Sequence, residues 1–107
     1  MSFDAFDVSI KMVRSLRQPL KQVQAFDASL ATQLRRAAAS VPLNLNEGRR
    51  RVGGDRLHLW RIAAGSADEV RACLLVAEAR GYLEPEAMVE PLALLDRVLA
   101  MSWRLTH

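Results

Sequence analysis

The chain has 107 residues, of which half are hydrophobic and a quarter are charged. This length and composition are typical of one globular domain, residues 1–107, and exclude an intrinsically disordered chain. Cys73 is the single cysteine, which excludes an internal disulfide and suits a reducing compartment. No uninterrupted apolar stretch approaches the roughly 20 residues that a membrane-spanning helix needs. A soluble cytoplasmic protein is therefore expected.

Positive charge is concentrated early in the chain, although the formal net charge is only +3. Residues 11–61 contain eleven basic and three acidic side chains, whereas residues 62–107 contain four basic and seven acidic ones. Such asymmetry favours a basic surface for a polyanion, or a surface that pairs with an acidic one. On charge alone, a solvated face is an equally good interpretation.

The first predicted helix spans residues 4–24 and is amphipathic. Its apolar side chains fill one broad arc at about 100° per residue, and only Ile10 lies outside that arc. The opposite arc carries a basic stripe of Lys11, Arg14, Arg17 and Lys21. Pro19 has no backbone N–H to donate, so we predict a kink or break near it.

The second helix is predicted to run from an N-cap at Asp27 to a stop at Gly48. Pro42 lies inside its apolar pattern, so a kink or break is expected there as well. Residues 52–54 form the predicted connection to the third helix. Asp55 is the expected N-cap of that helix, which continues to about Arg80 and is ended by Gly81-Tyr82.

A fourth helix is predicted to start at Pro85, because proline suits the first helical position, and to run to about Leu105. Four helices with short connections predict an all-α protein, an antiparallel up-down-up-down four-helix bundle. The first, third and fourth helices carry apolar residues on more than one face. Because so small a bundle cannot bury them all, we predict a subunit interface and a homo-oligomer.

Two blocks of the sequence carry a family resemblance. Residues 33–48 read QLRRAAASVPLNLNEG, and the second block contains Ile-Ala-Ala-Gly-Ser at 62–66, Glu69 and Gly-Tyr-Leu at 81–83. The chain in these blocks resembles the bacterial four-helix bundle proteins encoded within intervening sequences of large-subunit ribosomal RNA genes. The same family includes the accessory variability proteins of diversity-generating retroelements. The chain departs from the family pattern in its first helix, where a tryptophan is missing and Pro19 is added.

The resemblance implies a bundle that assembles into a ring, typically a pentamer. In the retroelement relatives, the ring presents a basic surface to nucleic acid and to a reverse transcriptase. RNA or DNA, and a reverse transcriptase, are therefore the partners that the resemblance implies for this chain, together with further copies of itself.

The strongest candidate binding site is the basic turn after the second helix. Arginine pairs with phosphate through charge-assisted and often bidentate hydrogen bonds. No aromatic residue lies in the turn itself, which favours recognition of the phosphate backbone over base stacking. The alternative is a solvated loop whose arginines pair with acids of a neighbouring subunit. With the two helices that could extend the patch, the candidate nucleic-acid-binding residues are Arg49, Arg50, Arg51, Arg56, Arg61, Arg35, Arg36, Lys11, Arg14 and Arg17.

Polar side chains recur at helical spacing in the second and third helices. We predict that they are structural, because polar groups at a close helix crossing can satisfy backbone groups freed around Pro42 and fix the register. The set comprises Ser40, Asn44, Glu47, Ser66 and Glu69. Neither segment contains the histidine that a base would require, so no catalytic residues and no enzymatic activity are expected.

No metal site or cofactor is expected either. Di-metal sites in bundles use Glu-x-x-His pairs, and this chain contains none. The nearest approach is Asp55 followed by His58, and an N-cap explains that aspartate better.

The sequence therefore predicts a non-catalytic, homo-oligomeric bundle that binds nucleic acid through phosphate backbones. The alternative is a protein-interaction scaffold. In that case the arginine patch would bind an acidic partner, or the acidic start of the last helix, with Glu84, Glu86 and Glu90, would bind a basic one. A bundle with no ligand beyond itself is a third possibility.

Overall fold

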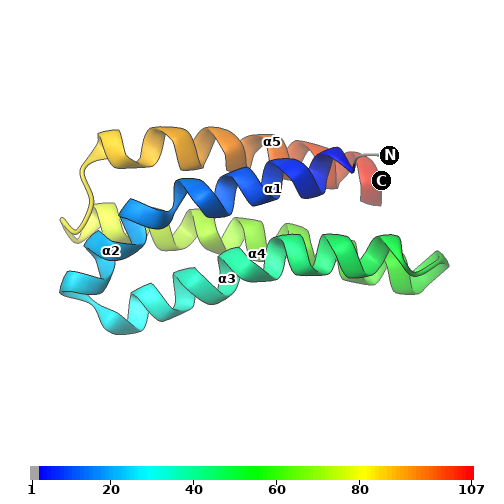
Figure 1. Ribbon diagram of the computed structural model, residues 1–107, viewed down its shortest axis with the longest axis horizontal. Helices are drawn as coiled ribbons and strands as arrows, with labels where there is room; N and C mark the ends of the chain where they lie inside the picture. The colour runs from blue at the N-terminus through cyan, green and yellow to red at the C-terminus, as the bar shows by residue number, and fades with distance from the viewer. Residues whose placement is uncertain (1–2) are drawn as a thin grey trace.

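The computed structural model describes residues 3–107, which contain helices and no strands. Antiparallel packing runs around the bundle: α3 packs on α4, α4 on α5, α5 on α1, and α1 and α2 on α3 (Figure 1). The prediction of an all-α bundle is confirmed. The elements are α1 (Asp4–Ser15), α2 (Arg17–Phe26), α3 (Ala28–Arg49), α4 (Gly53–Ala79), the short 3-10 helix η1 (Pro85–Met88) and α5 (Val89–Thr106).

The first predicted helix is divided into α1 and α2 at Leu16. Pro19 explains the division, because its nitrogen cannot donate to the carbonyl of Ser15 and its ring crowds that carbonyl. At the junction, the N–H of Leu16 bonds to the oxygen of Val13, three residues earlier, at 3.1 Å. Leu16 and Pro19 are both buried, so the junction lies in the core. The predicted break near Pro19 is confirmed.

Helix α3 starts as predicted, because the backbone N–H of Leu30 donates to Oδ1 of Asp27 at 3.0 Å. It then runs uninterrupted through Pro42 to Arg49, so no break occurs there. Its ribbon changes direction near the middle instead (Figure 1). Proline removes one helical hydrogen bond, but buried side chains on either side of it, Val41 and Leu45, hold the two halves of α3 against the core.

Two predicted helix boundaries are wrong. Gly48 does not stop α3, and it is buried within the last turn, where an added Cβ would lie 2.5 Å from Cδ1 of Trp60. Asp55 does not cap α4, which begins at Gly53 with Val52 before it and no side-chain cap. Gly53 has a φ of +58°, a conformation that glycine tolerates, and this lets the chain enter the helix before Asp55.

The end of α4 agrees with the prediction. Gly81 adopts a φ of +80°, and the N–H of Tyr82 reaches back to the oxygen of Ala77 at 2.8 Å. The N–H of Gly81 bonds to the oxygen of Glu78 at 2.9 Å. Together these bonds form a Schellman motif, which satisfies the last carbonyls of the helix. Pro85 then starts η1, which leads into α5.

The core lies between the four antiparallel segments of the bundle, which are α1 with α2, α3, α4, and α5. Its largest fully buried apolar side chains are Met12, Leu16, Val23, Leu34, Val41, Leu45, Val70, Leu74, Leu95 and Val98. Other large apolar side chains within residues 3–107 stay exposed: Phe26, Leu43, Val52, Ile62, Leu75, Val76, Val89 and Trp103. None of the helices in this part of the chain is long and apolar enough to cross a membrane.

Candidate nucleic-acid interface

The turn between α3 and α4 projects beyond the ends of α1 and α5 (Figure 1). We call residues 49–61 the hairpin tip. It contains five arginines and one acidic residue, Asp55. Because helix ends and turns expose their side chains, this tip offers the densest positive charge in the chain to solvent.

Arg56 is used to close the end of α3. Its Nε donates to the oxygen of Gly48 at 3.2 Å, and its Nη2 donates to the oxygen of Arg49 at 2.9 Å. The guanidinium also lies over the ring of Trp60, 5.2 Å from its centroid. Arg56 thus caps carbonyls at the end of α3, and two of its five N–H donors are held there and not free for a phosphate.

Two other arginines of the tip, Arg51 and Arg49, are each held by neighbouring side chains. Nη2 and Nε of Arg51 donate to Oε1 of Glu47 at 2.7 and 3.2 Å, and this hydrogen bond is the main reason why the pKa of Arg51 is raised. The guanidinium of Arg49 lies 5.7 Å from the ring centroid of Phe3 and 5.8 Å from that of Phe6. Both arginines remain exposed, so they can still face a ligand.

The side chains of Arg50 and Arg61 are exposed and make no hydrogen bond or ion pair with any residue in the range 3–107. All of their guanidinium donors are therefore available to an external anion.

Phe3 and Phe6 support the tip by packing on Arg49, although sequence patterns did not predict them as part of it. No local pattern reveals that contact, because it joins the start of α1 to the end of α3.

The remaining basic candidates lie away from the tip. A surface hollow of about 360 Å³ between α1, α2 and α3 is lined by Ile10, Val13, Arg14, Arg17, Leu20 and Arg35. We call it the basic hollow. Lys11 and Arg36 are exposed on α1 and α3. The structure therefore places five of the ten predicted basic residues at the tip and three at the hollow, and Lys11 and Arg36 at neither.

Three of the five predicted structural polar residues form one cluster between α3 and α4. Oγ of Ser40 and Oγ of Ser66 lie 2.7 Å apart, and Nδ2 of Asn44 donates to both the Oγ and the carbonyl oxygen of Ser40 at 2.9 Å. Glu47 pairs with Arg51 instead, and Glu69 lies further along α4. The structural role of these residues remains a prediction.

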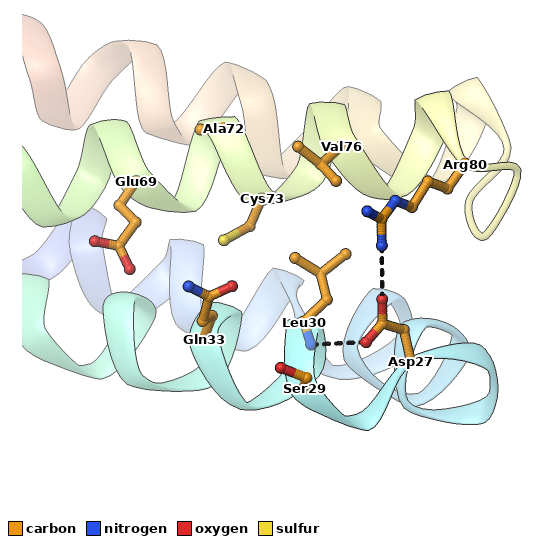
Figure 2. Close-up of a pocket in the computed structure, with 9 residues that line it drawn as sticks. All are labelled: Asp27, Ser29, Leu30, Gln33, Glu69, Ala72, Cys73, Val76 and Arg80. Carbon is orange, nitrogen blue, oxygen red and sulfur yellow. Dashed lines mark hydrogen bonds and ion pairs between the residues drawn. The ribbon is translucent and has the colours of Figure 1, made fainter.

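A groove of about 450 Å³ continues the seam between α3 and α4 (Figure 2). Gln33 of α3 faces Glu69 and Cys73 of α4 across it, and Asp27 lies at one end. Oδ2 of Asp27 accepts from Nη1 of Arg80 at 3.2 Å, and the pKa of Asp27 is lowered, chiefly by the hydrogen bond from the N–H of Leu30. Within residues 3–107, no three histidine, cysteine, aspartate or glutamate side chains gather as a metal site.

Cys73 in this groove is expected to react slowly with thiol reagents. Burial, and secondarily the charge of Glu69, raises the pKa of the thiol, and only the thiolate is nucleophilic. Alkylation by iodoacetamide at neutral pH should be several-fold slower in the folded protein than in urea-unfolded protein. Glu69→Gln should raise the folded-state rate slightly. Equal rates in the folded and unfolded chains would contradict the burial of this thiol.

Comparison with known proteins gives a family match and a similar solved structure. Residues 2–104 match the family described as 23S rRNA-intervening sequence protein. A similar solved structure is that of a protein of unknown function from the S23 ribosomal protein family of Bacteroides thetaiotaomicron. It aligns with a TM-score of 0.86 at 15% identity, over 95% of this chain and 97% of that one. At this identity the likeness shows a shared fold. No curated protein matches the chain.

Proposed function

This chain belongs to the 23S rRNA-intervening sequence protein family, and we propose that it is a non-catalytic, homo-oligomeric bundle that binds nucleic acid. The observation that carries the proposal is the hairpin tip, where Arg50 and Arg61 are exposed and unpaired among the described residues, beside the anchored Arg49 and Arg51. Guanidinium groups on a projecting surface can form bidentate hydrogen bonds with phosphate oxygens.

Recognition is proposed to involve the phosphate backbone and not the bases. Trp60, the aromatic residue of the tip, is buried, with 8% of its surface exposed. Phe3 and Phe6 are half-buried beneath Arg49, so no phenylalanine, tyrosine or tryptophan ring at the tip is fully presented for stacking. Binding should therefore depend on charge and salt much more than on sequence.

Assembly would multiply the effect of one weak tip. The exposed apolar side chains of α3, α4 and α5 support burial between copies, and the family resemblance implies a ring, typically a pentamer. Several tips on one assembly would bind a long polyanion with avidity, even when each contributes little.

The proposal is tested by fluorescence anisotropy with labelled single-stranded RNA and duplex DNA across a salt series. Affinity should fall linearly with salt on logarithmic axes, and the slope measures the phosphates contacted. The variant Arg50→Glu/Arg61→Glu should bind about tenfold more weakly and lower the salt slope by about 2, because each arginine accounts for about one contact.

A matched control separates the tip from net charge. Arg71→Glu/Arg97→Glu changes the charge equally, at exposed positions of α4 and α5. Arg71 lies ten residues from Arg61, about 15 Å along α4. This control should bind almost as wild type does. If both variants lose affinity equally, the tip is not the site.

The second candidate is a scaffold that binds an acidic protein, including a reverse transcriptase of the kind that the resemblance implies. The basic hollow favours it, because an apolar floor ringed by arginines suits a protein surface better than a bare phosphate chain. An absence of binding to RNA and DNA at low salt would support the scaffold over the first proposal.

A further inference from the structure

The basic hollow contains positive charge without a counter-charge. Arg14, Arg17 and Arg35 border it, and no acidic side chain lines it. Among the described residues, Arg14 and Arg17 make no ion pair, and Arg35 makes only a long hydrogen bond, 3.4 Å from its Nη2 to Oε1 of Gln24. Three like charges near one another repel, and an anion placed between them relieves the repulsion. The hollow therefore suits an acidic occupant.

The floor of the hollow is apolar, which indicates that the occupant also carries an apolar group. Ile10, Val13 and Leu20 are half-buried there. Ile10 is the residue that lies outside the apolar arc of its helix. A small ion would leave this floor wet, whereas an apolar side chain flanked by carboxylates would cover it and lower the local dielectric, which strengthens the ion pairs.

Such a surface exists on the same chain, where η1 enters α5. Glu86, Val89 and Glu90 are spaced three and four residues apart, so they share one helical face. All three are exposed, Val89 with 68% of its surface, and neither glutamate has an ion-pair partner within residues 3–107. We call this surface the acidic corner. Buried Leu83 and Met88 fix its backbone on the bundle.

Within one molecule the two surfaces do not pair. The hollow lies on the seam that α1 and α2 form with α3, and the acidic corner lies on η1 and the start of α5. Both are at the same end of the bundle, where η1 packs on α2 (Figure 1). Within residues 3–107, however, no ion pair joins Glu86 or Glu90 to an arginine of the hollow. Both surfaces therefore stay open to a second copy.

We propose that the acidic corner of one copy docks in the basic hollow of the next. Val89 would pack on the floor of Ile10, Val13 and Leu20. The carboxylates of Glu86 and Glu90 would pair with the guanidinium groups of Arg14, Arg17 and Arg35. The contact is heterologous, since the corner of one copy meets the hollow of the next, and such contacts close into a ring when the rotation between copies allows. This inference rests on the homo-oligomeric part of the proposed function and assigns its surfaces.

Charge reversal on each side tests the contact. Arg14→Glu/Arg17→Glu alters the hollow, and Glu86→Arg/Glu90→Arg alters the corner. Light scattering across a micromolar concentration series should show an oligomeric wild type. Each two-residue variant should need a protein concentration at least about tenfold higher than wild type to assemble, because like charges then face each other. The four-residue variant that combines both reversals restores complementarity, and it should assemble again.

Reassembly of the four-residue variant is the decisive result, because damage to the fold or to general solubility would not be repaired by further surface changes. Circular dichroism verifies that each variant is folded. A four-residue variant that stays dissociated would overturn the proposal, as would two-residue variants that assemble like wild type. A monomeric wild type would overturn it too, and mass recovered only with an added acidic protein would assign the hollow to a different partner.

The hairpin-tip variant keeps this test separate from the phosphate-binding proposal. Arg50→Glu/Arg61→Glu should lose nucleic-acid affinity and keep the mass of the wild-type assembly. The hollow variant should lose mass first, and its loss of affinity should follow the loss of avidity. Failure of either pattern therefore identifies which proposal is wrong.

Discussion

Gly48→Ala is expected to destabilise the protein by about 1–3 kcal/mol, although alanine is favoured over glycine inside helices. The added Cβ would lie 2.5 Å from Cδ1 and 2.6 Å from Nε1 of Trp60. Trp60 has little room to withdraw. Its Nε1 donates to the oxygen of Leu45 at 3.2 Å, and its ring packs against Phe3 and Arg56. Urea unfolding followed by circular dichroism measures the change in the free energy of unfolding.

Gly65→Ala is the matched control for that experiment. Gly65 also lies inside a helix, α4, but a Cβ added there would meet nothing within 4 Å. Here only helix propensity changes, so the substitution should stabilise the protein by up to about 1 kcal/mol. If Gly48→Ala stabilises equally, then α3 and α4 are farther apart at Trp60 than the structure shows.

Arg56→Met is expected to cost about 1–2 kcal/mol of stability and to change nucleic-acid affinity little. Methionine can still pack over Trp60, but it cannot donate to the oxygens of Gly48 and Arg49, so the end of α3 loses both hydrogen bonds. Unfolding in urea gives the first quantity, and anisotropy with RNA and DNA gives the second.

Arg50→Met should show the opposite result, since the side chain of Arg50 has no partner among the described residues. Its stability should stay within about 0.5 kcal/mol of wild type, as is usual for an exposed position, while affinity falls. A stable Arg56→Met variant with weakened binding would instead make Arg56 a phosphate ligand.

Sequence patterns succeeded where the cause of a structure is local. Pro19 divides a helix through its missing donor, Asp27 caps one through its own carboxylate, and Gly81 ends one through its left-handed backbone. Gly48 could not be interpreted in this way. A glycine at the end of an apolar pattern resembles a stop signal, yet the reason for this glycine is the Trp60 ring on the next helix.

The candidate site shows the same division. Composition identified which residues are basic, and helical spacing identified which of them share a face. Neither composition nor helical spacing could show that Arg56 faces back onto α3, or that Arg35 joins Arg14 and Arg17 at one hollow. Those arrangements arise from contacts between helices distant in the sequence, and Ile10 shows the clearest trace of them, since it lies outside the apolar arc of its own helix.

The projection of the α3–α4 turn has a consequence for motion. Beyond the contacts of Phe3 and Phe6 with Arg49 and Trp60, the turn between α3 and α4 projects past the ends of α1 and α5 (Figure 1). Amide hydrogens of residues 50–55 should therefore exchange with deuterium through local fraying, at a small fraction of the global free energy of unfolding. Amides next to buried Leu45 and Leu74 should exchange only when the whole bundle opens. The tip can thus follow the contour of an irregular polyanion while the rest of the molecule keeps its shape.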